Sequence, residues 1–352
     1  MNIERKTLGP NYPCFIIAEA GVNHNGDISL AKRLIDAASD SGADAVKFQI
    51  FKAENIVTVD AQKADYQKQS GSPLTTQYEM LKKLELTTTE FKILSEYSKK
   101  KGLVFLVTPF DIDSVDFLDE IDISAYKIPS GEINNIPLLK YISRKHKPIL
   151  LSTGMSTLGE VEQAVRAIGE EGNIDIILLH CVTNYPADLE EVNLRAIDTL
   201  RHAFGYPVGY SDHTLGIVIP VAAVARGACV IEKHFTLDKN LPGPDHKASL
   251  DPDELKSMIK AIREVEMAMG NGIKIPTRSE LENKKAIRRS IVAEKDLPKN
   301  TIITSNDVAI KRPGTGISSD HLSTIIGTRT KRNIKKDEIL TWNDVICSDH
   351  SG

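Results

Sequence analysis

The sequence has no strong excess of charge of either sign and no long apolar run. Its 352 residues carry a formal net charge of −4, with acidic and basic residues mixed along the chain. That balance gives no reason to expect a nucleic acid or an anionic membrane as a partner. No apolar run reaches the roughly 18 to 20 residues that a helix needs to cross a bilayer. The N-terminal stretch MNIERKTLGPNYP also lacks the apolar part of a signal peptide. We therefore expect a cytoplasmic protein.

Paired cysteines are missing as well. Cys14, Cys181, Cys229 and Cys347 are scattered, without the spacing of a zinc site or a disulfide framework, so we expect reduced thiols. The composition, 41% hydrophobic and 26% charged, is that of an ordinary globular protein. The length predicts one large domain, or a large domain with a small one.

Eight short apolar runs, typical of buried strands, occupy the first two-thirds of the chain. They are FIIAEAG (15–21), AVKFQIF (45–51), VFLVTPF (104–110), AYKIPSG (125–131), PILLSTG (148–154), DIILLHC (175–181), PVGYSDH (207–213) and VIEKHFT (230–236). Strand and helix signals alternate, which predicts an α/β fold, a closed (β/α)8 TIM barrel. The structural alternative is an open doubly wound sheet. That fold favours a glycine-rich first turn, and GVNHNG does not match GxGxxG.

Helix start and stop signals lie between these runs. Thr87 with Glu90, and Thr157 with Glu160, have the spacing of a capping box. Gly42 follows a segment with helical periodicity and is placed to end that helix. These signals support the alternation that the barrel requires.

Every predicted strand ends in polar residues. They are Glu19 and Asn23, Lys47 and Gln49, Thr108, Lys127 with Ser130 and Glu132, Ser152 with Thr153, Thr183, Ser211 with His213, and Glu232 with His234. One polar strand end is usually a solvated terminus, but eight in succession argue against that reading. Active sites of TIM barrels lie at the carboxyl ends of the strands. We therefore expect a catalytic site there.

The stretch CVIEKHFT (229–236) passes directly from apolar residues to ionisable ones. Alternation places Glu232 and His234 on one face and Lys233 on the other, and we assign Lys233 no catalytic role. His213 ends the preceding strand. Neighbouring strands lie about 4.8 Å apart, so both imidazoles can reach one divalent ion. Imidazole favours Mn, Fe, Co or Zn over Mg or Ca. The open coordination positions suit a metal that polarises a substrate carbonyl.

Two lysines end inside the barrel mouth. Burial of Lys47 and Lys127 is costly unless an anion compensates their charge. Nearby hydroxyl groups, those of Thr108, Ser130, Ser152 and Ser211, supply hydrogen-bond donors. We therefore predict a site for a phosphate, and for a carboxylate as well. The alternative for Lys127 is a Schiff-base lysine, as in metal-free aldolases, which the neighbouring histidine pair disfavours.

Four acids, Glu19, Glu132, Glu232 and Asp245, are candidates for general acid–base catalysis or for binding sugar hydroxyls. Asp245 falls in LPGPDHKASL (241–250), directly after the last predicted strand. A loop stiffened by proline and glycine at a barrel mouth is typical of a substrate loop. We therefore include Asp245 in the site.

The chain ends in a different kind of region. Helical periodicity stops after GNGIKIPTRSE, and short β-rich pieces follow. We divide the chain into a barrel (1–272), a linker (273–285) and a small β-rich domain (286–352). About 60 residues is near the lower limit for an independent core, so we expect this domain to dock against the barrel or another chain. Arg312, in KRPGTGIS, either reaches another domain's site or lies in a solvated turn, and spacing alone favours the turn.

Taken together, these stretches resemble the sialic acid (nonulosonate) synthase family over nearly the whole chain. The matching motifs are IAEAGVNHNGD, DAVKFQIFKA, VTPFD, YKIPSGEINN, ILLSTGM, LLHCVTNYP, GYSDHTLG, IEKHFTLDKNLPGPDHKASL and KRPGTGIS. The resemblance implies a barrel followed by an antifreeze-like (SAF) domain. It also implies a domain-swapped homodimer in which the small domain caps the partner's barrel.

The resemblance further implies a role for each candidate. The metal ligands are His213 and His234, with Mn2+ expected and Mg2+ or Co2+ as alternatives. The phosphoenolpyruvate contacts are Lys47, Thr108, Lys127, Ser130, Ser152, Thr183 and Ser211; the catalytic carboxylates are Glu19, Glu132 and Glu232; the sugar contacts are Gln49, Tyr185, Asp245 and, from the partner chain, Arg312. Some members carry Asn where this chain has Thr183, so the resemblance does not decide whether Thr183 contacts the phosphate.

The implied reaction condenses phosphoenolpyruvate with an N-acyl amino sugar and releases phosphate by C–O cleavage. We expect N-acetylmannosamine as the acceptor and N-acetylneuraminate as the product. The first alternative is 2,4-diacetamido-2,4,6-trideoxymannose, which would give N,N'-diacetyllegionaminate. A more distant alternative is a Schiff-base aldolase that acts through Lys127.

Overall fold

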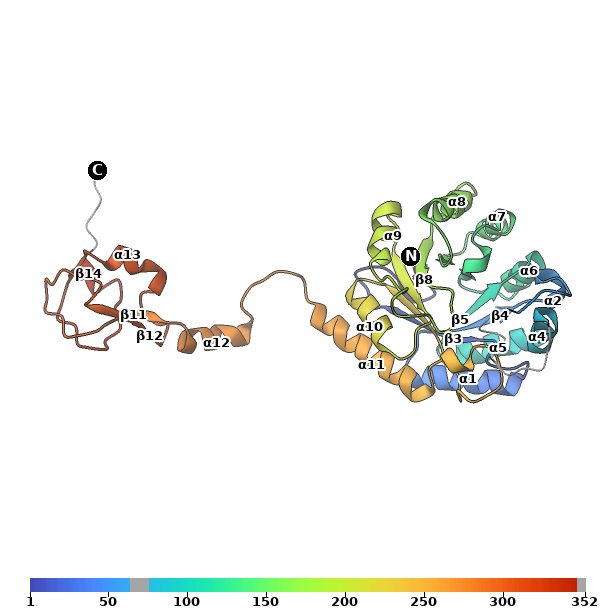
Figure 1. Cartoon of the computed structure of the whole chain (residues 1–352), viewed down its shortest axis with the longest axis horizontal. Helices are drawn as coiled ribbons and strands as arrows, with labels where there is room; N and C mark the ends of the chain where they lie inside the picture. The colour runs from blue at the N-terminus through green and yellow to red at the C-terminus, as the bar shows by residue number, and fades with distance from the viewer. Residues whose placement is uncertain (64–75, 347–352) are drawn as a thin grey trace. The chain divides into compact units, whose positions relative to one another are not determined.

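The computed structural model of the chain describes residues 1–63 and 76–346. Eight parallel strands close into a barrel in the order β10-β3-β4-β5-β6-β7-β8-β9, so the last strand pairs with the first (Figure 1). The strands are β3 Phe15–Gly21, β4 Ala45–Ile50, β5 Val104–Pro109, β6 Tyr126–Ile128, β7 Ile149–Ser152, β8 Ile176–Cys181, β9 Val208–Asp212 and β10 Val230–His234. Each lies within one predicted apolar run, and the predicted (β/α)8 barrel is confirmed.

Helices connect the strands around the outside of the barrel (Figure 1). They are α1 Ile28–Ser41, α2 Ala53–Ile56, α4 Gln77–Leu84, α5 Thr88–Lys100, α6 Ile112–Glu120, α7 Ile136–Ser143, α8 Leu158–Gly169, α9 Ala196–Phe204, α10 Val218–Ala225 and α11 Pro252–Met269. Thr87 with Glu90 and Thr157 with Glu160 form the predicted capping boxes. Gly42 ends α1 at φ 84°, a left-handed conformation that glycine adopts without strain. No helix in the described part of the chain is long and apolar enough to span a membrane.

Two apolar layers line the barrel wall. Outward side chains such as Ile16 pack with the helices, while inward side chains such as Ile17 fill the barrel interior. An N-terminal hairpin, β1 Asn2–Ile3 with β2 Lys6–Thr7, adds Ile3 and the following Leu8 to the interior layer. The polar residues of the interior are therefore concentrated toward the carboxyl ends of the strands.

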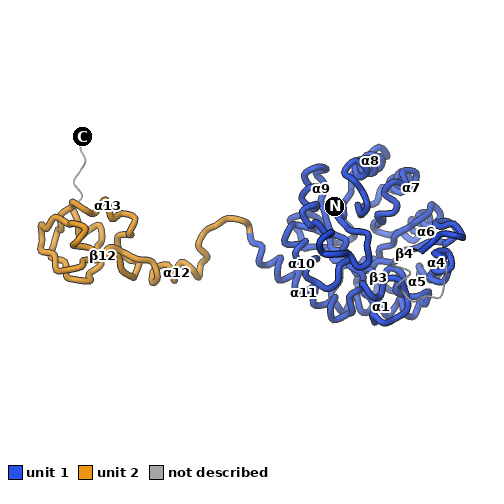
Figure 2. Tube along the Cα trace, viewed as in Figure 1, with its two compact units in different colours: residues 1–270 blue, residues 271–352 orange. Residues whose placement is uncertain are grey.

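The chain divides into two compact units, residues 1–270 and 271–352 (Figure 2). The second unit contains two antiparallel pairs, β11 Ser290–Ala293 with β12 Val308–Lys311 and β13 Arg329–Thr330 with β14 Val345–Ile346, together with η3 Ser319–His321 and α13 Leu322–Ile325. Ile291, Ile303 and Leu340 belong to its own apolar core. The small β-rich domain predicted after the barrel is therefore present.

One helix lies where the sequence predicted the end of helical structure. α12, Arg278–Ile287, occupies much of the predicted linker. Thr277 and Glu280 cap it reciprocally: the N–H of Thr277 donates to the Glu280 carboxylate at 2.7 Å, and the N–H of Glu280 donates to Thr277 Oγ1 at 3.3 Å. None of its residues is buried. The helix therefore has no buried face, and a buried apolar stripe, on which the sequence prediction relied, is missing.

Candidate active site

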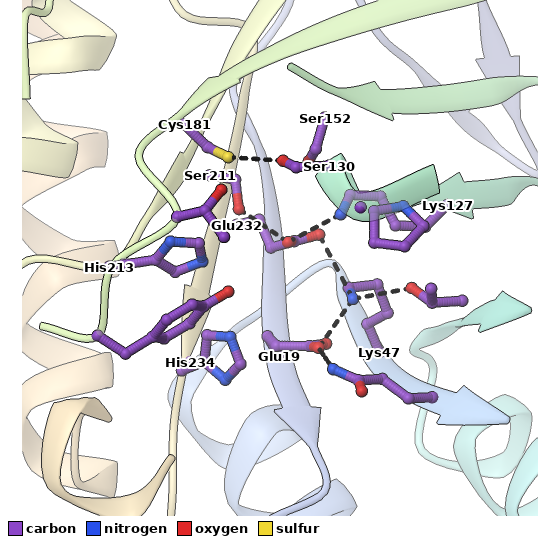
Figure 3. Close-up of a pocket in the computed structure, with 16 residues that line it drawn as sticks. Glu19, Lys47, Lys127, Ser130, Ser152, Cys181, Ser211, His213, Glu232 and His234 are labelled. Carbon is purple, nitrogen blue, oxygen red and sulfur yellow. Dashed lines mark hydrogen bonds and ion pairs between the residues drawn. The ribbon is translucent and has the colours of Figure 1, made fainter. Parts of the chain in front are cut away.

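A pocket lies at the carboxyl ends of the barrel strands (Figure 3). All eight strands or their immediate C-terminal ends contribute to its lining: Glu19, Lys47, Gln49, Thr108, Lys127, Pro129, Ser130, Gly131, Ser152, Cys181, Thr183, Tyr185, Ser211, His213, Glu232 and His234. Strand alternation explains this convergence, since every second residue of a barrel strand points inward. Most residues that the sequence predicted for the site are therefore brought together.

Four charged side chains form a continuous set of buried ion pairs in the pocket (Figure 3). Nζ of Lys47 lies 2.8 Å from Oε1 of Glu19 and 3.8 Å from Oε2 of Glu232. Nζ of Lys127 lies 3.1 Å from Oε1 of Glu232, and Nζ of Lys47 also donates to Thr108 Oγ1 at 3.1 Å. Burial of unpaired charges is costly, so the carboxylates keep the lysines protonated inside the barrel. The lysines can in turn neutralise an anionic substrate.

These groups differ in proton affinity from their ordinary values. Burial raises the pKa of Glu19, and the attraction of Lys47 only partly offsets this effect. Burial would also raise the pKa of Glu232, but Lys127 and Lys47 together lower it to about 2. Burial lowers the pKa of Lys127, although Glu232 opposes this. Glu232 therefore remains ionised and orders the lysines, whereas Glu19, with its raised pKa, is the better candidate for proton exchange.

Hydroxyl groups and one glycine lie beside the lysines. Oγ of Ser130 accepts a hydrogen bond from the N–H of Gly154 at 2.9 Å. Oγ of Ser152 is buried and has no hydrogen-bond partner among the described residues, so it can donate to an anion. A Cβ atom on Gly154 would lie 2.2 Å from Thr183 Oγ1 and 2.8 Å from Ser130 Oγ. Only glycine leaves this side of the pocket open.

His213 and His234 project into the pocket from the ends of β9 and β10, with their ring centroids 5.5 Å apart (Figure 3). Nδ1–H of His213 donates to the backbone oxygen of Val182 at 2.6 Å, which leaves the lone pair of Nε2 available. Nδ1 of His234 is buried without a hydrogen-bond partner among the described residues. The ring of Tyr185 lies 4.0 Å from that of His213, centroid to centroid. Two side chains with free imidazole nitrogens therefore share one side of the pocket.

These two histidines fit a divalent cation with an open coordination sphere. Burial lowers the pKa of His213 to about 4 and lowers the pKa of His234 well below its usual value, so both rings are neutral at pH 7. Neutral imidazole is the form that binds metals, and a backbone carbonyl on the other nitrogen is a common orienting contact. Within the described residues no cluster of three or more His, Cys, Asp or Glu side chains has metal-binding geometry. A cation here would have two protein ligands.

Asp245 lies at the edge of this group and does not line the pocket itself. Its Oδ2 atom is 3.8 Å from Nδ1 of His234. Burial raises the pKa of Asp245 to about 7. The sequence placed Asp245 among the sugar contacts, and the structure places it beside a histidine of the site, at the start of the 3-10 helix η2 His246–Ala248.

Glu132 is not among the residues that line the pocket, and its role as a catalytic carboxylate stays a prediction. Strand β6 is only three residues long, and the chain turns into the 3-10 helix η1 Ser130–Glu132 directly after Pro129. The carboxylate of Glu132 accepts a hydrogen bond from Nδ2 of Asn135 at 2.7 Å. Arg312 belongs to the second unit, where it is exposed. Its predicted sugar contact stays a prediction.

Sequence reasoning missed Cys181 and Pro129 as lining residues. Sγ of Cys181 lies 3.1 Å from Oγ of Ser130, and burial raises the pKa of this thiol. Cys181 is therefore a neutral, weakly polar wall of the pocket. Strand alternation alone places Cys181 on the same inward face as Leu179, two residues earlier on β8. A cysteine at the end of an apolar run does not by itself indicate a binding role, so the sequence did not single it out.

The fold and the pocket are those of a TIM-barrel enzyme, with lysine, hydroxyl and paired imidazole groups at the strand ends. Comparison with protein families then identifies the family to which this enzyme belongs. Residues 34–274 match the NeuB family, and residues 288–346 match the SAF domain. The chain belongs to the NeuB family and is an enzyme, as the sequence motifs predicted.

Similar proteins extend over nearly the whole chain. An N,N'-diacetyllegionaminic acid synthase of Legionella pneumophila is 48% identical over 97% of this chain and 97% of its own length. An enzyme of the same name from Campylobacter jejuni is 52% identical over 92% of this chain and 98% of its own. The crystal structure of an N-acetylneuraminic acid (sialic acid) synthetase from Leptospira borgpetersenii is 38% identical, with a TM-score of 0.71 over 80% of this chain and 94% of that chain.

Proposed function

We propose that this enzyme condenses phosphoenolpyruvate with 2,4-diacetamido-2,4,6-trideoxymannose, giving N,N'-diacetyllegionaminate and phosphate. The observation that carries the choice of acceptor is the similarity to two diacetyllegionaminic acid synthases, each sharing about half of the aligned residues. This reverses the order expected from the sequence, which put N-acetylmannosamine first. N-Acetylneuraminate synthesis remains the second candidate, because a sialic acid synthetase shares the fold at lower identity.

The proposed reaction forms one carbon–carbon bond and breaks one carbon–oxygen bond. C3 of phosphoenolpyruvate attacks the aldehyde carbon of the open-chain sugar, and positive charge develops at C2. Water adds to C2, and the C2–O bond to phosphate breaks. Of the two protons of this water, one goes to the alkoxide formed from the aldehyde oxygen and one leaves with the phosphate. Phosphoenolpyruvate, sugar and water thus give the nonulosonate and inorganic phosphate, without a redox step.

The pocket supplies groups for each part of this reaction. Lys47 and Lys127 are the counter-charges for the phosphate and carboxylate of phosphoenolpyruvate, and the free hydroxyl of Ser152 is a further donor. Fixing both substrates in one site makes the carbon–carbon bond formation effectively unimolecular. Glu19, whose pKa is raised by burial, is the carboxylate that we propose moves the proton.

We further propose that His213 and His234 would hold a divalent cation, with Mn2+ expected and Mg2+ or Co2+ as alternatives. Such an ion, when bound, supplies Lewis-acid polarisation of the aldehyde oxygen. The neutral state of both rings and the contact of His213 with the Val182 carbonyl support this assignment. Glu232, ionised and hydrogen-bonded by Ser211 Oγ at 2.9 Å, keeps the lysines in place rather than exchanging protons.

A Schiff-base mechanism through Lys127 is the less favoured alternative. Burial lowers the pKa of Lys127, which alone would favour a nucleophilic amine. The partner of Lys127 is Glu232, with a pKa of about 2, so the pair is a carboxylate and an ammonium ion. An ammonium ion in this contact has no lone pair with which to attack a carbonyl.

We also propose a homodimer in which the second unit of one chain contributes Arg312 to the partner's barrel. Arg312 is exposed, and its loop is anchored within its own unit: the N–H of Gly314 donates to the Lys285 oxygen at 2.8 Å, and Ser290 Oγ donates to the Pro313 oxygen at 2.7 Å. A guanidinium group on a fixed loop is suited to bind a polar group of a substrate. The cytoplasmic location expected from the sequence stays a prediction.

The test is phosphate release from phosphoenolpyruvate with a panel of amino sugars, with and without a chelator. We expect turnover with 2,4-diacetamido-2,4,6-trideoxymannose to exceed that with N-acetylmannosamine, and the chelator to stop both. A preference for N-acetylmannosamine would contradict the proposed acceptor and would favour N-acetylneuraminate synthesis, the second candidate. Borohydride trapping of pyruvate on Lys127, together with activity in the chelator, would instead support the Schiff-base alternative.

A further inference from the structure

A second pair of buried charges lies in strands β9 and β10, on the face opposite to the pocket. Nζ of Lys233 lies 2.5 Å from Oδ2 of Asp212, and both side chains are 0% exposed. Neither residue lines the pocket, and the proposed reaction uses neither. A buried ion pair is often no more stabilising than apolar residues of the same size. Stability alone therefore does not explain why this position holds an ion pair.

The pair holds the chain on both sides of His213. Besides its contact with Asp212, Nζ of Lys233 donates to the backbone oxygen of Thr214. The carboxylate of Asp212 closes the same turn: Oδ1 accepts from the N–H of Thr214 at 3.0 Å, and Oδ2 accepts from Thr214 Oγ1 at 3.1 Å. The residues immediately before and after His213 are thus tied to one ammonium group on the neighbouring strand.

The pair also specifies how the two strands align. Lys233 is the register partner of Asp212. The residues that follow them are His234 and His213, whose ring centroids lie 5.5 Å apart. A shift by one residue would separate the buried charges and would turn one imidazole to the other face of the sheet. Breaking a buried ion pair is strongly destabilising, so the shifted alignment is excluded.

We infer that Lys233 and Asp212 are positioning residues whose ion pair fixes the turn and the strand register that hold His213 and His234 side by side for a divalent cation. This inference rests on the cation site proposed above. It gives a role to Lys233, to which the sequence assigned none. Removal of the ammonium group should weaken the cation site even though it touches neither imidazole.

The test compares Lys233→Met with Arg263→Met as a matched control. Both changes remove a cation from an ion pair of the barrel. Nη2 of Arg263 lies 3.0 Å from Oδ2 of Asp44, the residue directly before strand β4, so this pair does not involve β9 or β10. Co2+ affinity is measured by calorimetry, and its coordination by the visible absorption spectrum. We expect Lys233→Met to bind Co2+ about tenfold more weakly or worse, with an altered spectrum, as when groups that orient metal ligands are removed. Arg263→Met should bind as the unchanged protein does, although its Tm also falls.

Wild-type affinity and spectrum in folded Lys233→Met would overturn the inference, and so would an equal loss of affinity in both variants. If Lys233→Met does not fold, Asp212→Asn carries the test, because it removes the negative charge of the ion pair and keeps an oxygen that can accept from the N–H of Thr214. We then expect Co2+ binding about tenfold weaker, and unchanged binding would overturn the inference. If the unchanged protein binds no Co2+, or binds it equally after His213→Ala, the cation site itself is wrong.

Discussion

Glu19 and Lys47 lie on neighbouring strands of the barrel with 2.8 Å between Oε1 and Nζ, and both side chains are almost completely buried. The lysine stays charged because the carboxylate is next to it. The carboxylate in turn has a raised pKa because burial outweighs the attraction of the lysine. One contact thus combines an anion-binding group with a group able to exchange protons.

Glu19→Gln should separate these two functions. We expect kcat for phosphate release to fall about 10²- to 10⁴-fold, the usual contribution of a general acid or base. The KM for phosphoenolpyruvate should stay the same or fall, because Glu232, 3.8 Å from Lys47, still keeps this lysine charged, while one negative charge beside the anion site is lost. Glu120→Gln, at an exposed ion pair with Lys92, serves as the control. A kcat within twofold of the unchanged enzyme would show that Glu19 moves no proton.

Gly154→Ala should close the side of the pocket near Ser130 and Thr183. The new Cβ would lie 2.2 Å from Thr183 Oγ1. We expect the KM for phosphoenolpyruvate to rise about tenfold or more, since a positioned donor to a charged group contributes about 1.5–3 kcal/mol. Gly159→Ala in α8 is the matched control, because its nearest atom is 4.0 Å away. Steady-state kinetics of both variants check this, and equal KM values would contradict it.

Chelation should abolish activity, and Mn2+ should restore it. We expect His213→Ala and His234→Ala each to lose activity and bound metal, because two protein ligands leave no redundancy in the site. Metal content after dialysis against Mn2+ measures this directly. His202→Ala is the control, because its Nδ1 contacts only the backbone oxygen of Asp198 on α9. Full metal content in His213→Ala would exclude the histidine pair as ligands.

Acid should destabilise the barrel through His24. Burial lowers the pKa of His24 to about 4, whereas the unfolded chain has the ordinary value near 6.5. Between these values the unfolded state binds more protons, so stability from neutral His24 is complete above pH 6.5 and is lost as the pH falls toward 4. The full loss is about 3 kcal/mol.

His24→Asn should remove this part of the pH dependence. Urea unfolding followed by far-ultraviolet circular dichroism at pH 7.5 and 4.5 measures it. The decrease in the free energy of unfolding between the two pH values should be about 2–3 kcal/mol smaller in the variant. Trp342, the single tryptophan, lies in the second unit, so its fluorescence reports that unit separately. An unchanged decrease would mean that His24 is not held neutral in the folded barrel.

Mixed dimers test whether the two chains share a site. Arg312→Ala and His213→Ala should each be inactive or nearly so as homodimers. If the second unit of one chain completes the partner's barrel, a mixed dimer pairs the intact barrel of the Arg312→Ala chain with the intact second unit of the other. We expect activity to return on mixing after denaturation and refolding together. Absence of recovery, with mixed dimers demonstrated by differently tagged chains, would argue against sharing.

The inward-facing part of the site could be predicted from the sequence, because alternation on a strand fixes the face of each residue. Glu232 and His234 are examples, and both line the pocket. Glu132 could not be placed, since the three-residue strand β6 ends early and the chain turns before it. The sequence placed Lys233 on the opposite face and gave it no catalytic role. Its partner Asp212 belongs to another strand, and only the register shows that they meet.

The closure of the barrel between β10 and β3 also determines when the site can form during synthesis. His234 pairs in register with Glu19, more than two hundred residues earlier in the chain. A ribosome-bound chain that stops before β10 has emerged therefore carries Lys47 and Lys127 without Glu232, and one imidazole without the other. Until β10 has been synthesised, the edge of the sheet at β3 stays unpaired. During this interval, pairing with another nascent chain is most favoured. For this protein, chaperone dependence should be set by the time between translation of β3 and of β10.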